Sequence, residues 1–397
     1  MHVCPKCNAV YEGEVKFCKV DGTPVIPLTS ETHIPLGVTV NESLRVAERL
    51  RTDRFGVVYR VDDTIDTGQS YALRLFRRGL VNTRVFEALG KLAERLRESL
   101  TEPDILADYI PIQLEDGRYA LLATDFPGIA LDQIILNEAP LTPTFVVGIL
   151  LRIADVLAGA HRSGLVHGNI TPENVLVVDR SDRGAAIKLA DFGVASTIRK
   201  HNARALTAPL QNRRLQTYDN YFAPELVTGR GVVASERTDI FSLGALCYQM
   251  LSGWIPFSEA AIEGDTSAVY LTEDPRPLLV LNEELGIPRG LEQAMLKALE
   301  VDPTARHRSL GELIEVLQEI EFDLSIMPPP GAKTDGSKMR QRRASAPTGR
   351  PAPQRLARTS AVGGRQTDPL GPDGRQATTG DVGETDDEPD RPGRHGD

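Results

Sequence analysis

The sequence has little of several features that mark broad classes of protein. Only four of its 397 residues are cysteine, and aromatic residues make up 5%. The formal net charge is −10 and no strong basic region stands out, which argues against nucleic-acid binding through phosphate contacts. The start, Met1-His2-Val3-Cys4-Pro5, has no charged leader followed by an apolar run, so no secretory signal is expected.

Long apolar runs are also scarce. The most apolar stretch, residues 144–160, is interrupted by Arg152 and Asp155, which makes it too short and too charged to span a bilayer. These absences predict a soluble, cytoplasmic protein that binds neither nucleic acid nor membrane. The length leaves room for two or three domains, and Leu, Ile, Val and Ala are plentiful enough to fill a substantial core.

Three of the cysteines, Cys4, Cys7 and Cys18, lie in the first eighteen residues. Without a secretion signal, this crowding indicates metal binding rather than disulfides. The segments Cys4-Pro5-Lys6-Cys7 and Cys18-Lys19-Val20-Asp21 look like the two knuckles of a small zinc ribbon, with Asp21 as the fourth ligand and His2 as its competitor. Zinc would supply most of the folding energy of so short a segment. The alternative is a set of reduced thiols without metal.

By pattern and composition the chain divides into four consecutive parts. The second is a connector, the third has a β-rich half (about 40–125) and a helical half (about 126–322), and the last is predicted to be a disordered tail. The tail combines proline, glycine and charge, which leave little to bury. The four parts are residues 1–28, 29–39, 40–322 and 323–397.

Local patterns predict individual elements within the third part. Period-two runs favour strands at 57–61, 71–75 and 119–122, around a helix near 83–99. In the second half, Thr142-Pro143 is a helix start, and Ser309-Leu310-Gly311-Glu312 is a capping box before a final helix. Residues 239–251 are apolar almost all round, which indicates a buried helix with Cys247 as a core residue.

Two short motifs in the helical half carry most of the functional information. His167-Gly168-Asn169-Ile170-Thr171-Pro172-Glu173-Asn174 is followed, after a strand-like stretch, by Asp191-Phe192-Gly193. They resemble the catalytic loop and the magnesium loop of the bacterial, eukaryotic-like Ser/Thr protein kinase family. Further similar segments follow in the family's order, at residues 221–225, 238–244, 253–257 and 302–306.

The resemblance covers residues 40–322 and implies an α+β, bilobal protein-kinase-like fold. It also implies two structural roles. Asp239 would hold the backbone amides of the catalytic loop, and Arg306 would pair with Glu225. These structural elements are all present in the sequence.

The catalytic positions differ from the family. The resemblance gives His167 and Asn174 as retained, whereas Gly168, Asn169 and Thr171 stand in place of arginine, the catalytic aspartate and lysine. An amide cannot take up a proton near neutral pH, and losing a general base costs roughly 10²–10⁴ in rate. The sequence therefore predicts negligible turnover.

The phosphate-binding positions are also altered. Of the three glycines expected in the loop over the nucleotide, only Gly56 is present, with Arg51 and Asp53 at the other two positions. A carboxylate at Asp53 would repel a triphosphate. The alternative interpretation is an ordinary strand-turn-strand that binds no ligand.

Arg74 stands where the resemblance implies a phosphate-binding lysine, and Glu87 or Glu94 is the candidate partner on the following helix. A purely structural salt bridge of Arg74 is equally compatible with the sequence. Asn174 and Asp191 retain the family's set of magnesium ligands, so binding of ATP and Mg²⁺ without catalysis stays open. Asp191 could also be kept for hydrogen bonding alone.

These features together favour a pseudokinase that acts as a regulatory or scaffolding module in signalling, with structural zinc. The alternatives are a weakly active, atypical Ser/Thr kinase and a nucleotide-free scaffold. Expected partners are other signalling proteins, such as a partner kinase or a phosphopeptide-binding domain. Two tail motifs fit such partners: Ser345 follows Arg342-Arg343, as in basic-directed kinase sites, and Thr378 precedes Asp381 by three, as in phosphothreonine ligands.

Overall fold

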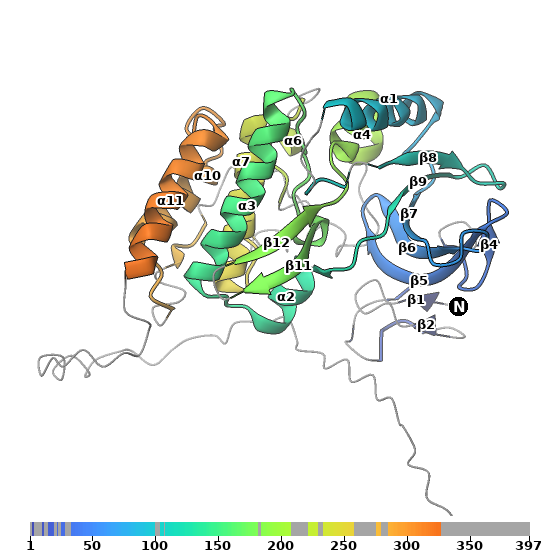
Figure 1. Cartoon of the computed structure of the whole chain (residues 1–397), viewed down its shortest axis with the longest axis horizontal. Coiled ribbons are helices and arrows are strands. Elements are labelled where there is room, and N and C mark those ends of the chain that lie inside the picture. Colours follow the sequence, from blue (N-terminus) through green and yellow to red (C-terminus); the bar gives the residue numbers. More distant parts are fainter. Residues whose placement is uncertain are drawn as a thin grey trace, which may run out of the picture. The chain divides into compact units, whose positions relative to one another are not determined.

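The structure is a computed structural model of the chain (Figure 1). It describes residues 33–99, 104–106, 108–181, 184–207, 221–228, 233–257, 275–278 and 285–326. Near the N-terminus it describes His2–Val3, Val10–Tyr11, 15–19, 22 and 25–27.

The first half of the kinase-like region is an antiparallel sheet of six strands in the order β4-β5-β6-β7-β9-β8. The predicted strands and the predicted helix α1 (Thr83–Ser99) are confirmed. α1 contacts the edge strand β8 and presents Val85, Leu89, Ala93 and Leu96 to the interior. The strands are β4 Thr39–Val40, β5 Leu44–Asp53, β6 Gly56–Asp63, β7 Ser70–Phe76, β8 Ile110–Gln113 and β9 Tyr119–Thr124.

Strands β5 and β6 form a hairpin whose turn consists of Arg54 and Phe55. Gly56 follows the turn with φ 150°, and a Cβ atom there would come within 1.9 Å of the Leu75 carbonyl oxygen on β7. Only glycine allows β7 to approach so closely. Backbone crowding within the sheet is therefore sufficient to explain Gly56, without any ligand.

The connector predicted at 29–39 is described from residue 33 onward and packs on this sheet. His33 and Ile34 are each 4% exposed. The Ile34 N–H donates to the Tyr59 hydroxyl at 2.9 Å, and Arg118 Nη1 donates to the His33 carbonyl at 3.4 Å. Residues 33–40 are thus part of the sheet's fold.

The second half is mainly helical. α3 begins as predicted, since the Thr142 hydroxyl accepts a hydrogen bond from the Phe145 N–H at 3.4 Å. The described elements of this half are β10 (Ile129–Ala130), α2 (Leu131–Glu138), α3 (Pro143–Arg162), η1 (Pro172–Asn174), β11 (Val175–Ser181), β12 (Gly184–Leu189), α4 (Val194–Thr207), α6 (Pro224–Thr228), α7 (Glu236–Ser252), α10 (Arg289–Ala298) and α11 (Leu310–Ile326).

Helix α3 corrects one expectation. Its 20 residues are long and apolar enough, by length and composition, to cross a membrane, whereas the apolar stretch was predicted to be too short. Within the structure 72% of its most apolar window is buried. α3 contacts β12, α7 and α11, which explains why it is apolar on several sides (Figure 1).

Helix α7 is buried as predicted from residue 238 to residue 252, and Cys247 within it is 2% exposed. Burial raises the pKa of the Cys247 thiol, which fits its predicted role as a core residue.

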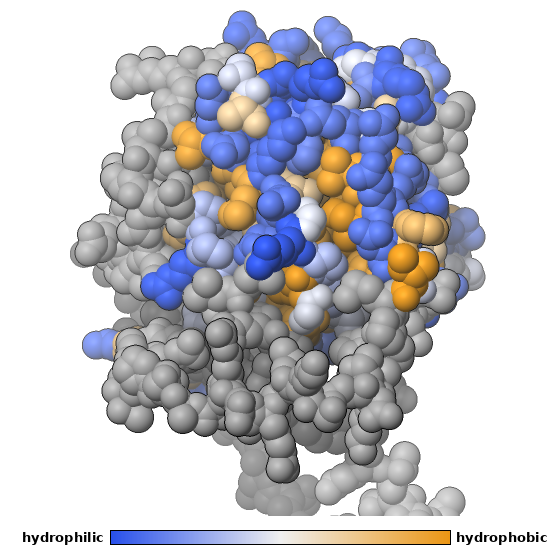
Figure 2. All heavy atoms as spheres, turned by 90° about the vertical axis from the view of Figure 1, so that its left-hand side faces the viewer, coloured by the Kyte–Doolittle hydropathy of each residue, from blue (hydrophilic) through white to orange (hydrophobic). Residues whose placement is uncertain are grey.

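Helix α11 continues to Ile326, beyond the predicted boundary at residue 322. The Ser309 hydroxyl caps it by accepting from the Glu312 N–H at 3.2 Å. Figure 2, a view from this side of the molecule, shows a mainly hydrophilic surface with scattered hydrophobic side chains. The predicted tail, including Ser345 and Thr378, lies outside the described residues.

Close to the N-terminus, β1 (His2–Val3), β2 (Val10–Tyr11) and β3 (Ile26–Pro27) form a small antiparallel sheet in the order β2-β1-β3. Cys18 is 4% exposed, and its carbonyl accepts a hydrogen bond from the Gly22 N–H at 2.9 Å. Cys4, Cys7 and Asp21, and the side chain of His2, lie outside the described part. The predicted zinc ligands are thus not described as a set.

Candidate active site

Asp239, in the first turn of the buried helix α7, holds the catalytic-loop motif in place. Its carboxylate is fully buried and accepts from the backbone N–H groups of His167 at 2.9 Å and Gly168 at 2.7 Å. His161 Nε2 lies 2.8 Å from the same carboxylate. The role that the resemblance implied for Asp239 is confirmed.

The second structural role is confirmed as well. Arg306 donates to the two Glu225 carboxylate oxygens at 2.9 and 2.8 Å, and its side chain is fully buried. This bidentate pair joins the segment that precedes α11 to the start of α6.

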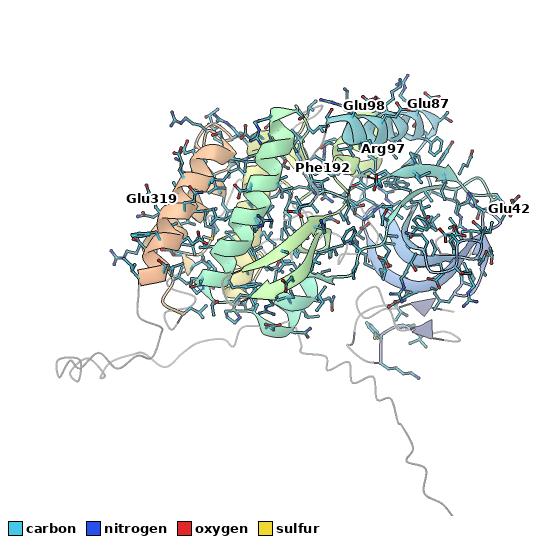
Figure 3. The ribbon with its side chains drawn as sticks, viewed as in Figure 1. Glu42, Glu87, Arg97, Glu98, Phe192 and Glu319 are labelled. Carbon is cyan, nitrogen blue, oxygen red and sulfur yellow. The ribbon has the colours of Figure 1, made fainter. Side chains whose placement is uncertain are left out.

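His167 and Phe192 pack against each other, with ring centroids 5.0 Å apart. His167 Nε2 lies 3.1 Å from the Ala190 carbonyl oxygen, and the Phe192 N–H donates to the Tyr109 hydroxyl at 2.6 Å. Burial lowers the pKa of His167 despite the opposing effect of nearby carboxylates. Phe192, in the interior in Figure 3, and His167 therefore contribute to packing, with the imidazole neutral.

Asn169 and Thr171 lie in the same anchored loop. Asn169 is 7% exposed, and its backbone carbonyl accepts from Asn174 Nδ2 at 3.0 Å. The Thr171 hydroxyl donates to the Glu173 carboxylate at 3.2 Å. The loop therefore presents an amide and a hydroxyl at the two positions where the kinase resemblance implies a carboxylate and an ammonium group.

Gly168 has a structural reason that the sequence did not reveal. Its φ is +71°, and a Cβ atom there would lie 2.0 Å from the Ser196 hydroxyl on α4. A side chain at position 168, such as the arginine implied for the family, would force the Ser196 hydroxyl to move and would carry the strain of a positive φ.

Arg74 does not pair with either predicted glutamate. Glu87 and Glu94 are exposed on α1, and Figure 3 shows Glu87 on its outer side. Arg74 instead donates Nε to Asp191 Oδ1 at 3.0 Å, and Nη1 to the two Asp53 oxygens at 2.9 and 2.8 Å. Its Nη2 donates to Asp191 Oδ2. The prediction of a helix partner is wrong because the inward positions of α1 are apolar.

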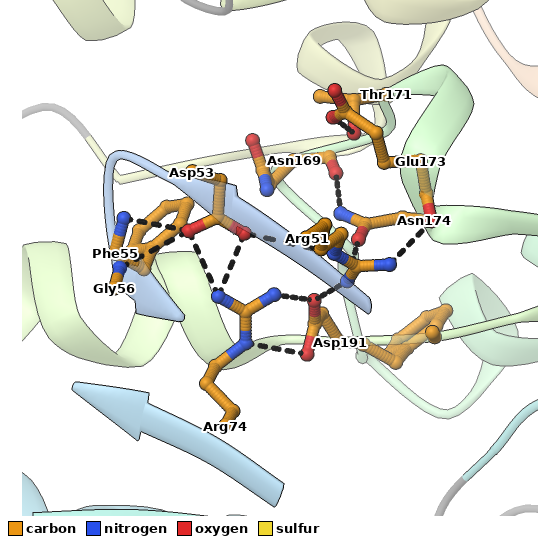
Figure 4. Close-up of polar contacts among 12 residues, drawn as sticks. Arg51, Asp53, Phe55, Gly56, Arg74, Asn169, Thr171, Glu173, Asn174 and Asp191 are labelled. Atoms are coloured by element: carbon orange, nitrogen blue, oxygen red, sulfur yellow. Dashed lines mark hydrogen bonds and ion pairs between the residues drawn. The ribbon is translucent and has the colours of Figure 1, made fainter. Parts of the chain in front are cut away.

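Asp53 accepts hydrogen bonds from the backbone of its own hairpin turn. Its Oδ1 accepts from the Phe55 N–H at 2.8 Å and the Gly56 N–H at 3.2 Å, in addition to Arg74 (Figure 4). Asp53 ends β5 and Arg74 lies on β7. The exchange of a glycine for aspartate and of a lysine for arginine, at two positions that both face the nucleotide in the kinase resemblance, is the signal from which this pair could have been inferred.

Arg51 makes contacts that were not predicted. Its Nη2 donates to Asn174 Oδ1 at 2.8 Å and to Asp191 Oδ2 at 2.7 Å, and its Nη1 donates to the Glu173 carbonyl at 2.6 Å (Figure 4). Burial would raise the pKa of Asp191, but Arg74 and Arg51 lower it more, so the carboxylate is ionised. The two side chains proposed as magnesium ligands are thus brought together, and both bind a guanidinium.

A magnesium ion does not fit this arrangement of side chains. Arg51 already donates to Asn174 Oδ1 and Asp191 Oδ2, and Arg74 donates to both Asp191 oxygens. We call Arg51, Asp53, Arg74 and Asp191 the arginine–aspartate cluster. Their side chains are 19%, 11%, 4% and 14% exposed.

The hairpin turn is also attached to the segment after the Asp191 motif. The guanidinium groups of Arg54 and Arg199 lie over the Phe222 ring, 5.3 and 5.2 Å from its centroid. Asn202 on α4 donates to the Leu80 carbonyl at 2.9 Å. Contacts across the two lobes thus extend beyond the arginine–aspartate cluster.

Comparison with known proteins supports the kinase-like fold. The protein kinase domain family matches residues 54–310. Serine/threonine-protein kinase pkn3 of Myxococcus xanthus is 26% identical over 74% of this chain and 52% of its own length. Serine/threonine-protein kinase PknL of Mycobacterium tuberculosis is 31% identical over 69% of this chain and 65% of its own length. The chain thus spans about half to two thirds of these curated relatives, and 31% and 38% of two others.

A solved structure shows the same fold. The crystal structure of a double mutant of the Mycobacterium tuberculosis PknI kinase domain is similar with a TM-score of 0.54. The match covers 73% of this chain and 99% of the PknI chain, at 22% identity. The chain therefore has a protein-kinase fold, with a sheet-rich N-terminal lobe and a helical C-terminal lobe.

Proposed function

The chain belongs to the protein kinase family, and from this premise we propose that it is a pseudokinase, a regulatory or scaffolding module in signalling. One observation carries the proposal. Asn169 lies in a catalytic loop that Asp239 holds through two backbone hydrogen bonds, so the loop is ordered but lacks a proton acceptor at this position.

The chemistry of phosphoryl transfer explains why this matters. The reaction requires an oriented hydroxyl, a proton acceptor and neutralisation of charge on the phosphates. The side chain of Asn169 accepts a hydrogen bond but no proton, and Thr171 donates to Glu173 and carries no positive charge. With both groups altered, the proposed activity is the binding of partner proteins rather than phosphate transfer.

A phosphotransfer assay tests the proposal. We expect incorporation of labelled phosphate from ATP by wild-type protein to equal that of an Asp191→Ala control. Asn169→Asp should add little, because Arg51 and Arg74 still bind Asp191. Robust, Asp191-dependent incorporation by the wild type would instead support a weakly active Ser/Thr kinase.

A combined variant tests whether the fold alone can support catalysis. It should recover measurable activity that Asn169→Asp lacks, since residues acting as a unit have non-additive effects. Equal, measurable rates for the two variants at saturating Mg-ATP would show that only the base is missing. The combined substitutions are Arg51→Gly, Asp53→Gly, Arg74→Lys, Asn169→Asp and Thr171→Lys.

We also propose that the N-terminal segment binds one zinc ion through Cys4, Cys7, Cys18 and Asp21. Three thiolates and a carboxylate are a suitable donor set for zinc. Burial of Cys18 and the turn closed by its carbonyl support the proposal. Elemental analysis should find close to one zinc per chain.

Variants identify the zinc ligands. A Cys4→Ser, Cys7→Ser double variant should contain no zinc, and zinc that survives this change would contradict the assignment. Asp21→Ala should lower the zinc content. If zinc is instead retained in Asp21→Ala and lost in His2→Ala, the fourth ligand is His2.

For partners we propose other cytoplasmic signalling proteins: a partner kinase, or a phosphopeptide-binding domain that recognises Ser345 or Thr378 once phosphorylated. The sequence around both residues supports this. Mass spectrometry after incubation with an active Ser/Thr kinase should detect phosphate at one of them. Binding of a phosphothreonine-specific domain should then be abolished by Thr378→Ala, if Thr378 is the modified residue.

A further inference from the structure

Arg51 supplies positive charge at the atoms that would bind a metal ion. Two of its nitrogens lie 2.6 Å from the Glu173 carbonyl, 2.8 Å from Asn174 Oδ1 and 2.7 Å from Asp191 Oδ2. Carboxylate and carbonyl oxygens of this kind are also the ligands that Mg²⁺ prefers. A guanidinium has only donors, so it matches these acceptors with hydrogen bonds instead of coordination.

Asp53 supplies negative charge at the loop that would cover a nucleotide phosphate. Its Oδ1 accepts from the backbone N–H groups of Phe55 and Gly56, and both oxygens accept from Arg74. Backbone amides in a turn and a neighbouring cation are the groups that bind phosphate in many sites. A phosphate entering here would compete with the carboxylate of Asp53.

The arginine–aspartate cluster is electrically neutral. Two guanidinium groups face two carboxylates, so the sum of the formal charges is zero. All three nitrogens of the Arg74 guanidinium donate to carboxylates. Mg²⁺ could reach Asp191 only if Arg51 left, because the ion and both arginines would repel one another.

The cluster also joins segments that are far apart in the chain. Arg51 and Asp53 lie at the end of β5, and they are linked directly or through Arg74 to Asp191 and to η1. In a kinase that binds Mg-ATP, the nucleotide and its metal contact these same segments of both lobes. Here side chains of the chain itself make that connection.

We propose that residues 51–53 act as an internal ligand, in which Arg51 takes the place of the divalent cation and Asp53 takes the place of a nucleotide phosphate. The inference rests on the proposed function and specifies its nucleotide state: the wild-type chain links its lobes without Mg-ATP. Removing both side chains leaves Arg74 in place but frees the Asn174 and Asp191 oxygens that Arg51 occupied, and the backbone N–H groups of Phe55 and Gly56 that Asp53 occupied, for a magnesium–nucleoside triphosphate.

Thermal unfolding with and without Mg-ATP tests this inference. Millimolar Mg-ATP should raise the Tm of the wild type by less than about 1 °C, because the folded wild type offers Mg-ATP no open site. The Arg51→Gly, Asp53→Gly variant should have a lower Tm without ligand. Mg-ATP should then raise it by about 3 °C or more, and ATP with EDTA should not.

A matched control separates loss of the cluster from loss of a side chain on β5. Arg45 is exposed on the same strand, so Arg45→Gly introduces a glycine into β5 without touching the cluster. It should respond to Mg-ATP as the wild type does. If the double glycine variant fails to fold, Arg51→Gln keeps a similar length and should bind Mg-ATP at least about tenfold more tightly than the wild type in calorimetry.

Two results would overturn the inference. One is Mg-dependent ATP binding by the wild type with an affinity equal to that of the variants. The other is a folded Arg51→Gly, Asp53→Gly protein, verified by circular dichroism, that does not bind Mg-ATP. Neither result requires turnover, so the pseudokinase proposal fails separately, through Asp191-dependent phosphotransfer by the wild type.

Discussion

Replacing Arg74 by lysine should destabilise this protein, although lysine is the residue that the kinase resemblance implies at that position. Arg74 reaches two carboxylates at once, since Nε and Nη2 donate to Asp191 while Nη1 donates to Asp53. A lysine ammonium is a single nitrogen on a flexible stem and cannot reproduce this fork. It would keep the charge and lose the bidentate contact with at least one aspartate.

The expected size of the effect follows from the hydrogen bonds. Burial would lower the pKa of Arg74, but Asp191 and Asp53 raise it more, so the guanidinium stays charged. Hydrogen bonds to charged groups contribute roughly 1.5–3 kcal/mol each. Because a lysine keeps part of the interaction, Arg74→Lys should cost about 2–3 kcal/mol. Arg74→Met leaves two carboxylates without this partner and should cost about 3–5 kcal/mol.

Urea denaturation at pH 7, followed by the fluorescence of the single tryptophan, Trp254, measures both variants against the wild type. Arg45→Lys, on an exposed position of β5, is the control and should change stability by less than about 0.5 kcal/mol. The cluster is largely buried, so 1 M NaCl should leave the differences in place. An Arg74→Lys protein as stable as the wild type would refute the assigned role of the fork.

Three further results are expected. Gly168→Ala should cost about 2 kcal/mol or more in urea denaturation, because of its positive φ and the contact with Ser196, and Ser196→Gly in the same chain should restore part of the loss. Burial and two nearby arginines lower the pKa of His33 to about 4. The stability that neutral His33 contributes is therefore present above its unfolded pKa of about 6.5, and the free energy of unfolding declines by roughly 2–3 kcal/mol as pH falls from 6.5 to 4. His33→Gln should flatten this decline in urea midpoints. For His161, burial lowers the pKa but Asp239 raises it more, and the net shift is upward. The stability that protonated His161 contributes is thus complete below about pH 6.5 and is lost as pH rises through the folded pKa. His161→Gln should remove this trend in urea midpoints.

Much of this fold could be predicted from the sequence, because the signals are local. The N-cap at Thr142, the helix over 83–99 and the burial of residues 239–251 depend on side-chain types at short spacing. The roles of Asp239 and Arg306 came from motifs in a characteristic order, and the structure confirms both. The chemical identity of Asn169 was also evident without a structure, since an amide cannot act as a base in any conformation.

The state of the candidate site depended on tertiary structure. The sequence offered Arg74 two candidate partners, Glu87 and Glu94. In the structure α1 turns both glutamates outward, and Arg74 binds Asp53 and Asp191 instead. Arg51 contacts residues 122 to 140 positions away, and no spacing rule connects them. The same holds for Gly168, whose constraint comes from a positive φ and from the Ser196 hydroxyl on α4.

The physical reason for this division is the range of the interactions. Turns, caps and amphipathic faces are determined by neighbours within a few residues, so the sequence by itself specified most of the elements and the absence of a catalytic carboxylate. Ion pairs between buried side chains depend on how strands and helices approach one another. They also depend on which carboxylates are buried with the arginine, because a buried charge without a counter-charge is costly. Only the tertiary structure therefore decided that Arg51 and Arg74 bind the side chains that would otherwise hold a metal ion.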